Sequence, residues 1–419
     1  MSTEAAVAPN PFGAEHLENP YPLLATLRDR SAIQRAEHPG GVESWLVLGN
    51  DEARAALKDA RLSTDPRHAP ELFRRAGLLL GDADEPASLL TSDPPDHTRL
   101  RKLVAGAFTP RRAARRRAAI EQVVDGLLDE IAPRGRAELV GDFAFVLPIV
   151  VITRLLGVPT EDREAFRRWT HEMQTPAGVP GAPARKRAGQ QAMHEYLRAL
   201  IAQRRATPAA GAPSADDDFG TALIHAADER AVSEGELVAL FFELLIGGYE
   251  TVANFLANAI HALLTHPEQR AYLQRHPERM ADAVEELLRF DGSVLRAVPR
   301  VAIADVELAG TRIPRGSLVT IVLGAGNRDP RAYERPEVLD LSRPASRHLS
   351  FGHGIHFCPG AGLARVEADI GLTRLLARLP DLALDGEPRH RAAGVMRAFE
   401  ELPVCFTPTH AVISPKETP

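Results

Sequence analysis

The chain has 419 residues, of which 44% are hydrophobic and 25% charged, a composition typical of a globular protein with a substantial apolar core. Its formal net charge of −6 gives no reason to expect binding to nucleic acid. Its two cysteines suit a cytoplasmic protein, and residues 1–20 contain no apolar run that could act as a signal or membrane anchor.

The first part of the chain is predicted to form short elements followed by an irregular segment. We expect a loose arm over 1–20 and then a helix near Tyr21–Arg30. Apolar and polar residues alternate over 42–49, which predicts a strand, and a helical pattern follows at 51–59. Residues 62–92 show little periodicity and are predicted to be a loop that carries apolar side chains.

A histidine and an arginine lie one turn apart in the next predicted helix, within 93–111. His97 and Arg101 are four residues apart and therefore share a face, where they could hold a pair of carboxylates. Most pairs with this spacing simply face solvent. A run of arginines follows, and it is either a solvated face or a docking surface for an acidic partner protein. Its members are Arg111, Arg112, Arg115, Arg116 and Arg117.

Amphipathic helices are predicted between about 120 and 205. Three prolines and two glycines interrupt them at 175–185, which predicts a flexible hinge. Residues 206–218 are polar and of low complexity, and we expect an exposed linker there rather than a domain boundary.

A long central helix is the strongest local prediction. Ser233 and Glu236 form a capping box, and apolar spacing continues to Leu264, so the helix should run for roughly 32 residues, or on the order of 48 Å. Gly247 and Gly248 are costly inside a helix. We expect a local bulge there that makes room for a ligand.

An acid and an alcohol follow these glycines in the middle of an apolar helix. Glu250 and Thr251 are adjacent in sequence, and buried ionisable and hydroxyl groups at such a place indicate proton handling. The alternative is that the hydroxyl bonds to a carbonyl of its own helix.

The remaining elements predict a mainly α-helical protein with a small β region, an α+β fold. Glu286 and Arg289 are three residues apart on a predicted helix, which suits an ion pair. Strand-like pieces with intervening turns follow over 301–310 and 311–329, and they predict a small mixed sheet.

A glycine-rich stretch around one cysteine, FGHGIHFCPGAGLAR (351–365), is the most specific motif. Apolar residues recur every three or four positions after it, so a helix is predicted just past Cys358, with Pro359 at its first position. The positive end of that helix would favour a thiolate, either a nucleophile or a metal ligand. A buried structural cysteine and a zinc site with His353 and His356 are the alternatives.

This stretch resembles the haem-binding signature of the cytochrome P-450 superfamily. The resemblance implies the fold of that family, with a long central helix over the cofactor, and Cys358 as the axial thiolate ligand of a haem b iron. The matching residues are Phe351, Gly352, Gly354, His356, Cys358, Gly360, Leu363, Ala364 and Arg365.

The same resemblance assigns roles to other residues. Thr251 would hydrogen-bond dioxygen, Glu250 would relay protons to it, and Glu286, Arg289 and Arg343 would brace the cysteine loop. His97, Arg101 and Arg300 would bind the haem propionates. The cofactor would also contact His356, Phe351 and Gly248, and the substrate would contact Ile246, Leu295, Val298 and Met396.

The implied activity is insertion of one oxygen atom from O₂ into a small organic substrate, by hydroxylation or epoxidation, in natural-product metabolism. Residues 1–419 are expected to form one monooxygenase domain, with a tail over 410–419, that works as a monomer away from membranes. The sequence has no dinucleotide-binding glycine motif and no cysteine cluster, so electrons should come from a ferredoxin and its reductase. The alternatives are a peroxide-driven or oxidative-coupling enzyme on the same scaffold and a non-catalytic haem or ligand-binding protein.

Overall fold

The computed structural model describes residues 8, 10–38, 41–78, 88–159, 162–175, 179–206, 219–230, 232–344, 347–393 and 395–409. The tail predicted over 410–419 lies outside the described residues, as do most of the predicted linker and part of the predicted hinge.

The described residues form fifteen α-helices and twelve strands. The helices are α1 Tyr21–Arg30, α2 Asn50–Lys58, α3 Pro70–Arg75, α4 Asp96–Ala105, α5 Pro110–Arg115, α6 Arg117–Ile131, α7 Val146–Leu156, α8 Arg163–Met173, α9 Ala182–Ala206, α10 Phe219–Glu229, α11 Glu234–Thr265, α12 Pro267–Arg275, α13 Met280–Asp291, α14 Leu323–Gly326 and α15 Ala361–Arg378. The strands are β1 Ile33–Glu37, β2 Glu43–Val47, β3 Leu62–Ser63, β4 Arg136–Glu138, β5 Arg300–Ala302, β6 Val306–Leu308, β7 Thr311–Ile313, β8 Leu318–Ile321, β9 Ala383–Leu384, β10 Arg389–Ala393, β11 Met396–Glu401 and β12 Pro403–Cys405.

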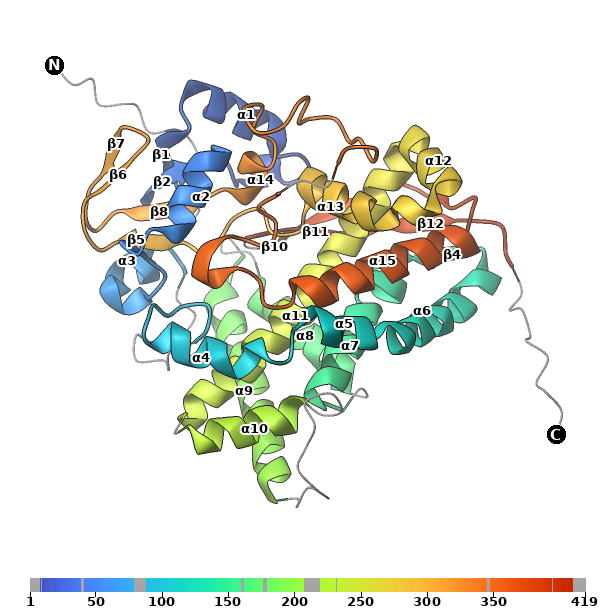
Figure 1. Ribbon diagram of the computed structural model, residues 1–419, viewed down its shortest axis with the longest axis horizontal. Helices are drawn as coiled ribbons and strands as arrows, with labels where there is room; N and C mark the ends of the chain where they lie inside the picture. Colours follow the sequence, from blue (N-terminus) through green and yellow to red (C-terminus); the bar gives the residue numbers. More distant parts are fainter. Residues whose placement is uncertain are drawn as a thin grey trace.

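Helix α11 forms the centre of the molecule, as predicted. Ser233 Oγ accepts the Glu236 backbone N–H and the Glu236 carboxylate accepts the Ser233 N–H, so the capping box starts the helix. The helix then continues for 32 residues until His266 and Pro267 end it. It packs against α7, α9, α13, α15 and β11 and passes between them in Figure 1.

The predicted bulge at the two glycines is wrong, because α11 is unbroken there. Gly248 has a packing reason instead: a Cβ at this position would lie 2.6 Å from Ile152 Cγ1 of α7. At Gly247 a Cβ would meet no atom within 4 Å. Gly248 therefore lets two helices approach closely.

The largest sheet and the β6–β7 hairpin lie at the left of Figure 1, where strands from the first part of the chain meet strands that follow residue 300, whereas β4 and β12 lie at the opposite side. The largest sheet has the order β1-β2-β8-β5-β3, with β2 and β8 parallel and the other neighbours antiparallel. The predicted mixed sheet is confirmed, and so is the mainly helical fold class. A large apolar core surrounds α11, and a smaller one lies under this sheet.

In the described part of the chain, no helix combines the length and the apolar character needed to cross a membrane.

Candidate functional site

The loop that carries Cys358 depends on two glycines in left-handed backbone conformations. Gly352 has φ +71° and Gly354 has φ +75°. A residue with a Cβ would be strained at these backbone angles, whereas glycine adopts them readily. A Cβ at Gly354 would also lie 2.7 Å from the Leu57 carbonyl oxygen of α2. The Cys358 N–H donates to the Phe351 carbonyl (2.9 Å) and closes the loop. The glycines are therefore explained by backbone shape and by the close approach of α2.

The helix after the cysteine starts later than predicted. Helix α15 begins at Ala361 with Gly360 as its N-cap, so Pro359 precedes the helix and is not its first residue. Burial outweighs the predicted effect of the helix end on the thiol, which is present because the Gly360 and Ala361 N–H groups lower the pKa of Cys358. Burial raises the pKa of Cys358 above its ordinary value, although the Gly360 N–H and the Arg101 charge oppose this. A raised pKa disfavours a free nucleophile, whereas a metal ion deprotonates a thiol that binds it.

Four basic side chains, two of them from α4, one from β5 and one from the loop itself, lie close together beside Cys358. Arg101 of α4 donates to the Phe357 carbonyl (2.6 Å), and the rings of His97 and His356 lie 4.5 Å apart. Arg300 of β5 is buried and donates to the Leu62 carbonyl (3.1 Å). The sequence-predicted residues from three distant parts of the chain therefore lie together.

The electrostatics of this cluster fit a dianionic cofactor. Burial, then the charges of Arg300, His97 and Arg101, lowers the pKa of His356 to about 3. Burial also lowers the pKa of Arg300 to about 10. His97 Nε2 and Arg300 Nε are buried and have no hydrogen-bond partner among the described residues. Buried cations and donors are costly unless paired, and the two propionates of a haem would pair them next to Cys358.

The zinc alternative finds no support. Among the residues that the structure describes, no three His, Cys, Asp or Glu side chains are grouped so that they could hold a metal ion. His353 and His356 therefore do not complete such a site with Cys358.

A buried ion-pair cluster lies behind the loop, where the sequence predicted it. Arg289 Nε lies 2.7 Å from Glu286 Oε2, and Arg343 Nε lies 3.2 Å from Glu286 Oε1. Arg289 also donates to the carbonyls of Asn327, Pro336 and Val338. The cluster therefore fixes α13 to the chain segment that precedes the cysteine loop.

A second group of ion pairs beside the cysteine loop was not predicted from the sequence. Glu285 of α13 binds Arg365 of α15 (2.6 Å) and His348 (3.2 Å). Burial raises the pKa of Glu285, but these two partners outweigh burial and lower it to about 2. The Arg365 guanidinium also lies 4.4 Å from the centre of the Phe351 ring. The signal was present, because Glu285 directly precedes Glu286 and Arg365 belongs to the motif.

The acid and the alcohol of α11 lie in different surroundings. Glu250 is 4% exposed, and burial raises its pKa to about 7 although Arg391 opposes this. Arg391 Nη2 lies 3.4 Å from Glu250 Oε1. Thr251 Oγ donates to the Gly247 carbonyl (2.7 Å), which is the alternative bond considered for this hydroxyl. The carboxylate is thus inside the protein, next to an arginine that the sequence did not single out.

A further acid of α11 holds the chain that precedes α4. Glu243 accepts the backbone N–H groups of Leu89 (2.9 Å) and Leu90 (3.1 Å). Burial raises the pKa of Glu243 to about 7, despite these bonds. The described end of the irregular segment is therefore tied to the central helix.

The predicted substrate residues differ in how far they are buried and in what they contact. Ile246 and Val298 are half-buried, and Met396 Sδ accepts a weak hydrogen bond from Asn254 (3.6 Å). Leu295 is buried in the apolar cluster under α1 and β2, and its contact with substrate stays a prediction. A Cβ at Gly248 would point at Ile152 of α7, and contact of this residue with the cofactor stays a prediction.

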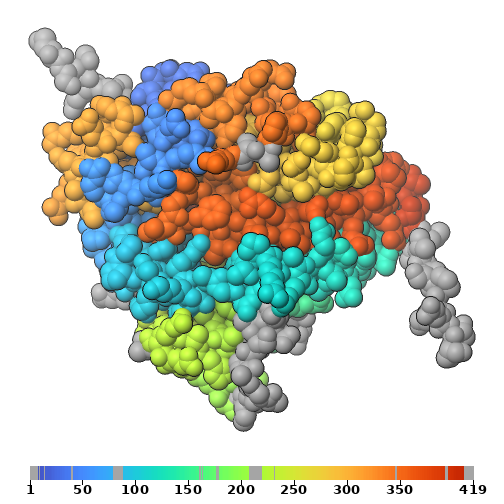
Figure 2. Space-filling model, viewed as in Figure 1, coloured from blue at the N-terminus to red at the C-terminus, as the bar shows by residue number. Residues whose placement is uncertain are grey.

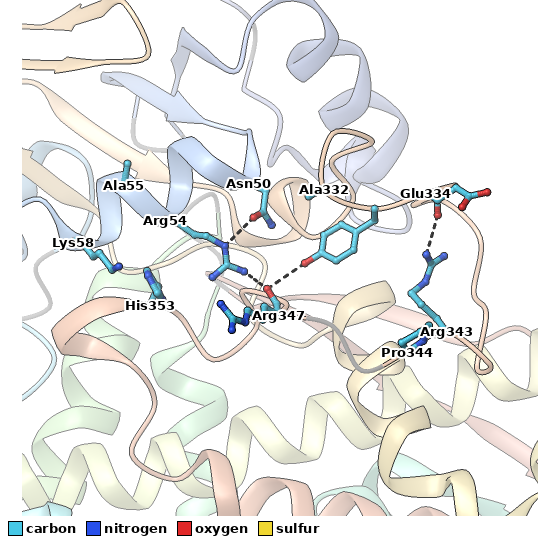
Figure 3. A pocket seen from close by; sticks show the side chains of 11 residues that line it. Asn50, Arg54, Ala55, Lys58, Ala332, Glu334, Arg343, Pro344, Arg347 and His353 are labelled. Atoms are coloured by element: carbon cyan, nitrogen blue, oxygen red, sulfur yellow. Dashed lines mark hydrogen bonds between the residues drawn. The ribbon is translucent and has the colours of Figure 1, made fainter.

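A surface cleft of about 620 Å³ lies next to the cysteine loop (Figure 3). Arg54 of α2 crosses it and donates to Asn50 Oδ1 and to the Arg347 carbonyl. His353 and Arg343 border the cleft, but no predicted catalytic or cofactor-binding residue lines it.

The arginine run lies along α15, on the face shown in Figure 2, where the cyan and teal α4–α6 adjoin the orange and red 350–378. Arg111, Arg115 and Arg117 are exposed, and Arg112 and Arg116 are half-buried.

Comparison with known proteins gives concordant results. A family model described as cytochrome P-450 matches residues 38–380. The chain is 43% identical to the cytochrome P-450 monooxygenase PikC of Streptomyces venezuelae, over 90% of this chain and 88% of the relative. It is 38% identical to the polyketide biosynthesis cytochrome P-450 PksS of Bacillus subtilis, over 95% and 98%. A solved myxobacterial cytochrome P-450 in complex with myristic acid superposes with TM-score 0.88 at 37% identity, covering 94% and 98%.

Proposed function

Since the chain belongs to the cytochrome P-450 family of monooxygenases, we propose that it inserts one oxygen atom from O₂ into a largely apolar natural product, with haem b as its cofactor. The observation that carries this proposal is the convergence of His97, Arg101 and Arg300 with the thiol of Cys358. The cluster offers one ligand for iron and several donors for two carboxylates.

Each group of residues has a defined task. Bound haem supplies the chemistry that activates O₂. The loop glycines and the N–H bond to Phe351 hold Cys358 in place, and the basic cluster orients the cofactor through its propionates. The ion pairs of Glu285 and Glu286 hold α13 against the loop and the segments that flank it.

Protons for the reaction pass along α11 in this proposal. Glu250 has a pKa near neutrality, so it can both take up and release a proton at physiological pH. Thr251, whose hydroxyl donates to the Gly247 carbonyl here, would hydrogen-bond the oxygen that bound haem activates. This pair favours O₂ over peroxide as the oxidant.

Electrons come from a separate ferredoxin and its reductase. Support comes from the sequence, which has no nucleotide-binding glycine motif, and from the arginine run beside α15. An acidic ferredoxin would be steered to that surface.

The substrate class is proposed from the relatives. One of them is named for polyketide biosynthesis, and the half-buried Ile246 of α11 and Met396, which contacts Asn254 of α11, offer apolar contacts. We therefore expect a substrate of the polyketide kind, oxidised at a carbon by hydroxylation or epoxidation.

Two matched cysteine variants test the core of the proposal. The haem-loaded, reduced protein with carbon monoxide should show the red-shifted absorbance of thiolate ligation. Cys358→Ser should abolish this band, and Cys405→Ser, in the other cysteine, should keep it. A histidine-type spectrum in the unmodified protein would overturn the proposal. Polyketide-type ligands that shift ferric haem to high spin are then incubated with O₂ and reductant or with peroxide alone. Product from peroxide alone would favour the peroxide-driven alternative.

A further inference from the structure

Arg391 joins three elements at the acid of the central helix. It lies on β10, and its Nη1 donates to Gln174 Oε1 at the end of α8. Its Nη2 lies 3.4 Å from both Glu250 Oε1 and Asn254 Oδ1 of α11. One guanidinium therefore bridges a helix end, the central helix and the C-terminal hairpin. Its side chain is 23% exposed, against 5% for that of Glu250.

We propose that Arg391 is a positioning residue for oxygen activation, which holds the Glu250 carboxylate and makes its protonation depend on where the end of α8 lies. The proposal rests on the proposed function in one respect, namely that Glu250 passes protons to the reacting oxygen.

The charges around Glu250 make Arg391 the dominant partner. Burial raises the pKa of Glu250 to about 7, and the opposing charge and hydrogen bond both come from Arg391. Tyr249 is the titratable neighbour on α11, and its pKa is raised by burial and by Glu250 itself. The facing groups of α8 and α11, Gln174 and Asn254, are neutral. Among the described residues, no other charge contributes to the Glu250 pKa.

A second hydrogen bond joins α8 to the part of α11 that carries Glu250. The Tyr249 hydroxyl bonds to Thr170 Oγ, one turn before Gln174, and both hydroxyls are buried. The end of α8 thus contacts the residue before Glu250 directly and Glu250 itself through Arg391. If α8 shifts, Gln174 no longer restrains the guanidinium, and the carboxylate loses part of its stabilising charge.

The predicted consequence has a definite sign. Because Arg391 favours the ionised form, Arg391→Gln should raise the Glu250 pKa by about one pH unit or more, which lowers the ratio of ionised to neutral Glu250 about tenfold at a given pH. The acidic limb of the pH profile for product formation should move to higher pH by a similar amount. Arg391→Lys keeps a positive charge at this position and should therefore raise the Glu250 pKa less than Arg391→Gln does.

The test measures Glu250 directly in the resting ferric holoenzyme. Infrared difference spectra over a pH series give the carboxyl titration, and Glu250→Gln identifies its band. Arg389→Gln is the matched control, because Arg389 lies on the same strand and pairs with Glu401 on the surface (2.6 Å). Gln174→Leu should raise the Glu250 pKa in the unmodified background and have no effect in the Arg391→Gln background.

Two outcomes would overturn the inference: a shift in Arg391→Gln no larger than in Arg389→Gln, or an equal effect of Gln174→Leu in both backgrounds. An unchanged reduced carbon-monoxide spectrum verifies that each variant is folded. If Arg391→Gln does not fold, the pKa shift is measured in Arg391→Lys instead. The titration needs no turnover, so it can succeed where product formation fails. Failure of the proposed function and failure of this inference are therefore distinguishable.

Discussion

At the scale of single residues, Glu250 and Thr251 show how neighbours on one helix acquire separate properties. The carboxylate is buried and bound by Arg391, whereas the hydroxyl bonds to the Gly247 carbonyl of its own helix. Because their partners differ, substitution of one should leave the environment of the other largely unchanged.

Thr251→Ala should lower the rate of product formation about 10²-fold while reductant consumption continues, because a positioned hydroxyl in proton transfer contributes on this order. Product and reductant are measured together under O₂. Thr265→Ala is the control, since Thr265 lies on the same helix and makes the same bond, to the His261 carbonyl (2.8 Å). An equal ratio of product formed to reductant consumed in both variants would contradict a catalytic role for Thr251.

Glu243 should make stability depend on pH. Its pKa is about 7 in the folded protein and ordinarily 4.5, so the folded state holds the proton more tightly. The contribution to the free energy of unfolding is fully present below pH 4.5 and is lost as pH rises through 7. Glu243→Gln should flatten this slope in denaturant titrations from pH 5 to 8. The same slope in Glu243→Gln as in the exposed-site variant Glu278→Gln would contradict the assignment.

At the scale of elements, the sequence predicted what local chemistry controls. The bounds of α11 were predicted well because its capping box and apolar spacing determine where the helix begins and how far it continues. A contact with a distant segment accounts for one error: the predicted bulge is absent, and Gly248 instead packs against Ile152 of α7.

The two glycines of α11 should respond oppositely to alanine. Gly248→Ala places a methyl group 2.6 Å from Ile152 and should lower the free energy of unfolding by about 1–3 kcal/mol. Gly247→Ala meets no atom within 4 Å and should raise it by up to about 1 kcal/mol through helix propensity. Denaturant unfolding measures both. Equal effects would contradict the packing explanation.

The buried pair of α13 should matter far more than an exposed pair of equal spacing. Glu286→Gln leaves Arg289 buried without its carboxylate, at a cost of about 3–5 kcal/mol in the free energy of unfolding. Asp282→Asn, which breaks the exposed pair with Arg279 (3.1 Å), should cost less than about 1 kcal/mol. Similar losses would show that the buried cluster does not brace the fold.

At the scale of the whole molecule, the fold class and the identity of the cofactor loop could be predicted because one motif is specific. The positions of His97, Arg101 and Arg300 around Cys358 could be proposed only through the family resemblance, since spacing along the chain does not determine which distant segments meet. Arg391 was missed for the same reason, because it lies in no local pattern that distinguishes it from a solvated charge. Glu285 was missed although it directly precedes Glu286, because its partner Arg365 lies 80 residues further along the chain.

The arginine run beside α15 should govern association with the electron donor. Arg111→Glu with Arg115→Glu should slow the first electron transfer from ferredoxin about tenfold or more at low salt, with the difference shrinking as salt rises. Stopped-flow reduction measures the rate. Arg275→Glu with Arg315→Glu makes the same charge change elsewhere on the surface. A rate that falls equally in both double variants would contradict a specific docking face.

The cysteine loop also has a consequence for how the chain folds. Its contacts come from α2 through Leu57, from α4 through Arg101 and from α13 through Glu285. Leu57 and Arg101 lie more than 250 residues before the loop, and Glu285 lies 80 residues before Arg365. Closing such long loops is slow, and these contacts cannot form before the cysteine loop itself has been synthesised. Cofactor capture is thus a late event during biogenesis, and nascent chains stalled before residue 350 should emerge from the ribosome unable to retain haem.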